Sequence, residues 1–199
     1  KWFLEKINNK KVRNRTRPIN ACTNIATTDL HCAHPTERNN RRLGMTETPL
    51  QDVRSLFQSE RSAVLCTAHA DLDGWPFGSI VPYAISSNGS LIVFLSDISE
   101  HSKNLQADNR ATVFLADPSV RDNPQAGPRH AMLVRARRPA GAEEAEAESH
   151  YFARFPDAEQ MRSMHGFAVW LLDCHRIRWI AGFGGMGWIE GDQWQGAID

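Results

Sequence analysis

The segment "LIVFLSDISEHSKNLQADNRATVFLADP", residues 91–118, indicates the fold more strongly than any other part of the chain. It begins and ends with short apolar runs, rich in β-branched and aromatic residues, that have the length of β-strands. The polar residues between these runs favour a helix. Asp97 is followed three residues later by Glu100, as in a capping box, so we expect the helix to begin near Ile98 and to end at about Ala107.

The first turn of this helix carries groups that bind anions. Amides without an intrahelical acceptor and the helix dipole both favour a phosphate at a helix N-terminus. The neighbouring hydroxyl, imidazole and ammonium groups belong to Ser96, Ser99, His101, Ser102 and Lys103. The alternative is that the serines only cap the helix while His101 and Lys103 are solvated. The local pattern leaves both interpretations open.

Further apolar runs lie on both sides of this segment. The runs at 62–69, 78–85 and 91–95 are separated by Asp73-Gly74 and Asn88-Gly89, which are typical of hairpins, and predict a three-stranded meander. More strands are expected at 111–116, 130–138, 167–173 and 175–183. A helix is expected with Thr48 as its N-cap and Pro49 at its first position, and two more are expected on either side of Pro156. Six or seven strands with only local helices predict a mainly β fold, a small closed barrel with peripheral helices.

Charge divides the chain into two parts. Residues 1–44 carry ten Lys or Arg against three Asp or Glu and show no apolar period, so we expect a disordered basic extension. It is either a translated upstream region or tag that is not native, or a genuine basic arm. Residues 45–199 are expected to form one folded domain. A nucleic-acid partner would depend wholly on the basic extension, and we expect none. The 199 residues carry no net formal charge as a whole.

Composition also limits the environment of the protein. No apolar run approaches the ~20 residues of a membrane span, so we expect no membrane partner. The four cysteines have no recognised disulfide or metal-binding spacing, which favours reduced thiols in the cytoplasm and no metal site. The remaining histidines, including His69, His130 and His175, show no ligand spacing either. Neither a nucleophile elbow nor a catalytic triad is present, so the catalytic residues stay unknown.

The order of several segments resembles the FMN-binding split-barrel superfamily of pyridoxamine 5′-phosphate oxidase, and most closely its haem-utilisation (HugZ-like) branch. The segments are "GWPFGSIVPYAI", "LIVFLSDISEHSKNLQADNRATVFLADP", "PRHAMLVRARRPA", "HYFARFPDAE" and "FAVWLLDCHRIRWIAGFGG". The resemblance covers nearly all of residues 47–190 and none of 1–44. It implies a six-stranded antiparallel split barrel at 45–199 that forms a homodimer and holds flavin mononucleotide (FMN) at the subunit interface.

The resemblance also implies cofactor-binding residues. Ser96 and His101 correspond to the residues near the phosphate, Asn104 follows in the same motif, and Lys103 is a weaker candidate because it points away from His101 on a helix. Ser79 corresponds to a hydroxyl residue on the strand that lines the flavin. Arg129 corresponds to a basic residue that reaches the phosphate or ring from either protomer. Asn104 bonded to backbone and Arg129 in a loop salt bridge are the structural alternatives.

Two departures from the family pattern bear on function. An arginine usually follows Gly-Phe-Gly, but Gly185 follows Gly182-Phe183-Gly184 here. Haem-degrading members carry an additional C-terminal domain with a histidine ligand, whereas this sequence stops at Asp199, so haem cleavage is not expected. The main prediction is an FMN-dependent oxidoreductase acting on a small organic substrate. The alternative is a non-catalytic split barrel that binds haem or another ligand.

Overall fold

The computed structural model describes residues 49–120, 122–164 and 166–196. The predicted basic extension at 1–44 and the expected N-cap Thr48 lie outside these ranges. No helix within them is both long enough and apolar enough to cross a bilayer.

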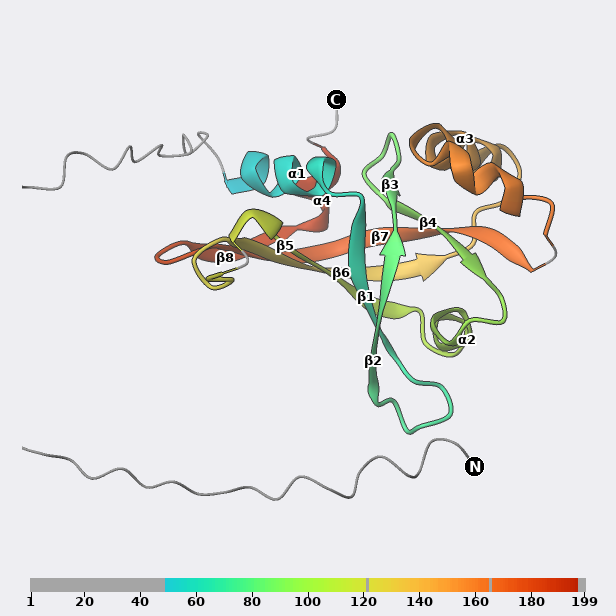
Figure 1. Ribbon diagram of the computed structural model, residues 1–199, viewed down its shortest axis with the longest axis horizontal. Helices are drawn as coiled ribbons and strands as arrows, with labels where there is room; N and C mark the ends of the chain where they lie inside the picture. Colours follow the sequence, from blue (N-terminus) through green and yellow to red (C-terminus); the bar gives the residue numbers. More distant parts are fainter. Residues whose placement is uncertain (1–48, 121, 165, 197–199) are drawn as a thin grey trace, which may run out of the picture. The chain divides into compact units, whose positions relative to one another are not determined.

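The described chain forms one curled antiparallel sheet with helices around it (Figure 1). The strands are β1 (Ser62–Ala68), β2 (Pro76–Pro82), β3 (Ala84–Ile85), β4 (Leu91–Ser96), β5 (Arg110–Ala116), β6 (Pro128–Arg137), β7 (Phe167–Ala181) and β8 (Met186–Glu190). The helices are α1 (Pro49–Ser59), α2 (Glu100–Ala107), η1 (Pro118–Val120), α3 (Ala142–Arg154), η2 (Pro156–Met161) and α4 (Gly191–Gln195).

The strand order shows how the sheet curls. Neighbours follow the order β2-β1-β5-β6-β7-β4-β3, and β8 pairs with the second half of β7. The two end strands, β2 and β3, are consecutive in the chain and are separated only by Tyr83. A single extended segment therefore pairs with β1 on one side and with β4 on the other, which brings the two edges of the sheet together. This confirms the mainly β, split-barrel fold with peripheral helices.

Two hydrophobic clusters hold the helices on the sheet. The main cluster fills the barrel and includes Phe57 of α1 and Trp194 of α4, whose rings are 5.4 Å apart. The Tyr83 hydroxyl donates to the Phe57 carbonyl at 2.7 Å, which ties the break between β2 and β3 to α1. The second cluster packs α3 against β4 and includes Phe94 and Tyr151. Burial of these side chains, at about 25 cal/mol per Å² of apolar surface, stabilises the arrangement.

The strands expected at 167–173 and 175–183 are one strand, β7. The register between β6 and β7 shifts because Leu133 pairs with Arg176 while Val134 pairs with Cys174. His175 is therefore the extra residue of a β-bulge. The bulge lets β7 continue where the alternation of apolar and polar residues is interrupted, and this interruption had suggested two separate strands. The sequence did not predict β8, whose five residues include Gly187. The expected strand at 78–85 is divided at Tyr83.

Helix α2 begins two residues later than expected. Its N-cap is Ser99, and no side chain caps it. The Asp97 carboxylate accepts a hydrogen bond from Arg138 at 3.2 Å, and the Ser99 hydroxyl donates to the Ser96 carbonyl at 2.7 Å. The capping box predicted from Asp97 and Glu100 is therefore wrong. The Arg138 guanidinium, which is distant in sequence, holds the group that was expected to cap the helix.

Candidate functional site

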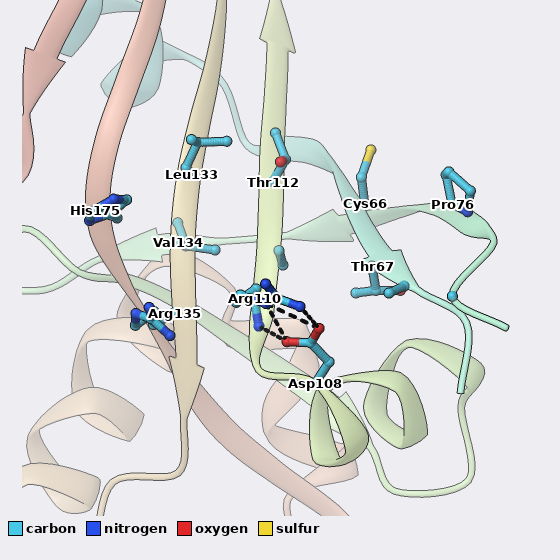
Figure 2. Close-up of a pocket in the computed structure, with 13 residues that line it drawn as sticks. Cys66, Thr67, Pro76, Asp108, Arg110, Thr112, Leu133, Val134, Arg135 and His175 are labelled. Carbon is cyan, nitrogen blue, oxygen red and sulfur yellow. Dashed lines mark hydrogen bonds and ion pairs between the residues drawn. The ribbon is translucent and has the colours of Figure 1, made fainter. Parts of the chain in front are cut away.

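The outer face of the barrel carries a cavity of about 500 Å³, within the usual size of ligand sites. Figure 2 shows its walls, which come from β1, β5, β6 and β7 and from the hairpin between β1 and β2. Cys66, Thr112 and Leu133 lie in one row across three neighbouring strands, because each is the register partner of the next. The row gives the cavity a mainly apolar floor with a thiol and a hydroxyl.

The bulge in β7 places His175 in this cavity. A bulged residue has no direct partner on the neighbouring strand, and bulges often redirect a side chain at a functional site. The His175 side chain is exposed and forms no hydrogen bond within the described ranges. Its imidazole is therefore available to a ligand, as a hydrogen-bonding group or as a metal ligand.

Two arginines line the end of the cavity nearest α2. Arg110 and Arg135 are register partners on β5 and β6. The Arg110 guanidinium forms a forked ion pair with Asp108, with distances of 2.6–3.1 Å, and these hydrogen bonds lower the pKa of Asp108 to about 2. Asp108 thus neutralises Arg110. Arg135 forms no hydrogen bond or close ion pair among the described residues, so it is the cation free to bind an anion.

The α2 corner is a second group of polar side chains, formed by Ser79, His101 and their neighbours at the start of α2. The Ser79 hydroxyl and His101 Nδ1 are 3.2 Å apart, so the structure brings these two predicted residues together. Burial lowers the pKa of His101, which favours the neutral imidazole. Only the amides of Glu100 and His101 lack a backbone acceptor among the described residues of the first turn, since those of Ser102 and Lys103 donate to Ser99. The corner can therefore donate several hydrogen bonds to an anion but offers little positive charge.

The ammonium group of Lys103 at this corner is already paired. Lys103 Nζ lies 2.7 Å from Glu100 Oε1, and this pair raises the pKa of Lys103 and lowers that of Glu100. The other Glu100 oxygen is 3.6 Å from His69 Nε2. Ser96 contributes its carbonyl to the Ser99 hydroxyl and lies at the end of β4. A phosphate at this corner would have to compete with Glu100 for Lys103.

Asn104 is fully buried and holds backbone in place. Its Nδ2 donates to Thr67 Oγ1 at 2.9 Å, and its Oδ1 accepts from the Ala70 amide at 2.8 Å. Both partners lie at the end of β1 or just beyond it, so Asn104 fastens α2 to that strand. Because Thr67 also lines the outer cavity, Asn104 connects the two groups of residues.

Arg129 lies far from the other predicted residues. It is register partner to Ala116, whereas Arg135, six residues along β6, is partner to Arg110 beside α2. Six residues of strand span about 20 Å. Arg129 Nη1 donates to the carbonyls of Gln125 and Gly127 in its own loop. One chain thus brings Ser79 and His101 together but does not bring Arg129 to them.

The sequence did not predict the outer cavity, and none of the six predicted cofactor residues lines it. A polar interruption at Asp173–His175 within a long apolar run was the available signal for His175, since such a break can mark a bulge. Arg110 and Arg135 gave no local signal, because only the β5–β6 register makes them neighbours. Within the described ranges, no group of three or more His, Cys, Asp or Glu side chains could hold a metal ion.

A curled antiparallel barrel with peripheral helices, and with a cavity of ligand size on β1, β5, β6 and β7, is typical of split-barrel proteins. A family model described as "CREG, beta-barrel" matches residues 48–196, about three quarters of the chain. The chain therefore belongs to the CREG β-barrel family, which has the FMN-binding split-barrel fold. This membership confirms the resemblance on which the predicted fold was based.

Named relatives include haem proteins. The chain is 25% identical over 155 residues to the chloroplastic haem oxygenase HOZ of Arabidopsis thaliana, covering 75% of this chain and 47% of that protein. A haem binding protein from Mycobacterium smegmatis superposes with a TM-score of 0.70 at 28% identity, covering 76% of this chain and 61% of that one. ChuZ of Campylobacter jejuni superposes at 0.62 with 21% identity, covering 72% and 59%, and shows the fold alone. The chain spans about half the length of the curated relative it matches.

Proposed function

We propose that this protein binds haem, or a tetrapyrrole like it, in the outer cavity of the barrel. The carrying observation is the combination of the unpaired Arg135, the bulged His175 and an apolar floor in one cavity of about 500 Å³. The printed names of the two most informative relatives, a haem oxygenase and a haem binding protein, support the same ligand. Haem, expected from the sequence only as the weaker alternative, thus has support comparable to that for FMN.

Each chemical feature of haem has a matching residue in the cavity. An arginine binds a carboxylate through charged, often paired hydrogen bonds, so Arg135 would hold a propionate. An imidazole is a common protein ligand of haem iron, so His175 would hold the iron. The Leu133 side chain would contact the macrocycle and exclude water. When bound, haem would supply an iron centre for ligand binding or electron transfer.

Titration of the full chain with hemin tests this proposal. We expect a saturable Soret band at one haem per chain, and weaker binding, by about tenfold, in Arg135→Gln, because a charge-assisted contact is lost. Lys103→Gln is the matched control, since Lys103 is a cation outside the cavity. Absence of a saturable band, or equal loss of affinity in both variants, would contradict haem binding in this cavity.

FMN at the α2 corner is the second candidate, and the contact between Ser79 and His101 supports it. The free amides at the start of α2 would bind the phosphate, and bound flavin would supply redox chemistry for a small organic substrate. Quenching of FMN fluorescence on binding would be lost in His101→Ala and kept in His175→Ala. Loss of quenching only in His175→Ala would place the flavin elsewhere.

A second copy of this chain is the partner we propose for the outer face of the barrel. Ile80, Val64, Phe114 and Ala131 are successive register partners across the sheet and form an apolar row, which Arg178 separates from Trp188. Ile80 is 76% exposed and Trp188 46% exposed, and contiguous apolar surface of this kind marks interfaces. A copy seated there would also lie over the outer cavity, because Phe114 is two residues along β5 from Thr112. Light scattering should give a dimer for wild type and a monomer for Phe114→Glu; a monomeric wild type would contradict the proposal.

A further inference from the structure

A second cavity, of about 550 Å³, lies at the helical end of the molecule and shares no residue with the outer cavity. Its walls come from α1, α3 and α4 and from the turn after β3, which Figure 1 shows between α1 and α3. We call it the helix cavity. The residues that line it are Arg54, Gln58, Ala84, Ile85, Ser86, Ser87, His150, Ala153, Arg154 and Trp194.

Two arginines enter the helix cavity from opposite helices. Arg54 of α1 donates from Nη2 to the Trp194 carbonyl at 3.2 Å, and its guanidinium carbon lies 5.6 Å from the centre of the Trp194 ring. Arg154 of α3 donates from Nη2 to the carbonyls of Gln58 and Glu60 at 3.1 and 2.6 Å. These contacts hold both guanidinium groups in place and use only part of their donors.

The remaining donors have no acceptor among the described residues. Nε of Arg54 and Nε of Arg154 are buried and make no hydrogen bond, and neither Nη1 has a partner. Partial burial removes water from the Arg54 guanidinium and lowers its pKa, because the charged form is less well solvated there. Nη1 of each arginine is free to donate to an anion in the helix cavity, and the two positive charges would stabilise such an anion.

The charge of the helix cavity has one sign. No Asp or Glu is among its lining residues, and His150 adds a third basic group. The Glu146 carboxylate accepts from the Ser87 hydroxyl at 2.7 Å and lies 3.8 Å from His150 Nε2. Neither Arg54 nor Arg154 forms an ion pair with a carboxylate among the described residues.

Part of the wall of the helix cavity is apolar. Ala84, Ile85 and Ala153 line it, and the Trp194 ring, 1% exposed, is fixed by its indole N–H, which donates to the Gly89 carbonyl at 2.7 Å. We propose that the helix cavity binds an organic phosphate monoester, with the phosphate held by Arg54 and Arg154 and the organic group against Ile85 and Ala153. Guanidinium groups bind phosphate through paired hydrogen bonds, and two of them match its double charge.

Calorimetric titration of the full chain with phenyl phosphate tests the proposal. We expect one saturable site per chain, tighter than for inorganic phosphate, which lacks the ring, and tighter than for benzoate, which carries one charge. Arg54→Gln should weaken binding roughly 10- to 100-fold. Ala153→Leu changes no charge and lies at an exposed helix position, and its larger side chain would fill the space beside the apolar wall. It should therefore weaken the binding of phenyl phosphate more than the binding of inorganic phosphate.

Two controls separate this site from the rest of the molecule. Arg162→Gln removes an exposed arginine that pairs with Glu159 outside the helix cavity and should leave the affinity unchanged, as should His175→Ala in the outer cavity. The proposal is overturned if phenyl phosphate shows no saturable heat. It is also overturned if benzoate binds as tightly, or if Arg162→Gln weakens binding as much as Arg54→Gln.

Discussion

Replacement of Asn104 by alanine should destabilise the protein, because the Asn104 side chain connects α2 to the end of β1. The side chain is fully buried and makes two hydrogen bonds, to Thr67 Oγ1 at 2.9 Å and from the Ala70 amide at 2.8 Å. Alanine leaves both partners without that contact, and Thr67 is only 4% exposed, so water does not easily replace it.

The expected loss follows from the cost of unsatisfied buried groups. Each costs about 1–2 kcal/mol, so Asn104→Ala should lower the free energy of unfolding by about 2–4 kcal/mol. For a chain of this size that corresponds to a fall in Tm of roughly 4–16 °C. Asn109→Ala is the matched control, because Asn109 is exposed and only its backbone carbonyl accepts a hydrogen bond, from Ala136.

Urea unfolding at fixed protein concentration measures the effect, and a double-mutant cycle with Thr67→Val isolates the direct contact. Since Thr67→Val removes the same hydrogen bond from the other side, the double variant should lose about 1 kcal/mol less than the sum of the single losses. A Tm for Asn104→Ala within about 1 °C of wild type would refute this reasoning.

Two further predictions concern a buried histidine and a glycine. Burial of His130, which is 2% exposed and has no hydrogen-bond partner on either ring nitrogen, lowers its pKa to about 4. The unfolded chain therefore binds a proton more readily, and stability should fall as the pH drops from about 6.5 through 4. The urea midpoint of His130→Met should depend less on pH, and an unchanged dependence would argue against this assignment. In Gly182→Ala, with φ +89°, the new Cβ would lie 2.2 Å from the Ala126 carbonyl oxygen, so we expect a loss of about 1–3 kcal/mol. Gly184→Ala, with nothing within 4 Å, should lose less in thermal melts; equal losses would count against a steric cause.

The sequence predicted most strands because alternation and turn residues are local. Asn88-Gly89 marked the turn between β3 and β4, and Pro156 marked the end of α3. The errors arose where distant residues decide the structure. Arg138 holds Asp97 away from the start of α2, and the pairing with β6 lets β7 continue through His175.

The candidate site was predictable only in part. Ser79 and His101 were matched through a family motif, and the structure brings their side chains together. Asn104 fixes backbone, which the sequence allows as the structural alternative to cofactor binding. The outer cavity depends on the β1–β5–β6 register, which no local pattern encodes, so Arg135 could not be selected from the sequence, and the polar interruption at Asp173–His175 was the one signal for His175.

The absorption spectrum of the hemin-loaded full chain, compared between wild type and His175→Ala, tests the central claim most directly. If the bulge in β7 presents His175 to the iron, the variant should retain bound haem while its Soret and visible bands shift. Cys66→Ser, which changes another possible ligand in the same cavity, should keep the wild-type spectrum. Identical spectra for wild type and His175→Ala would contradict haem ligation by the bulged histidine.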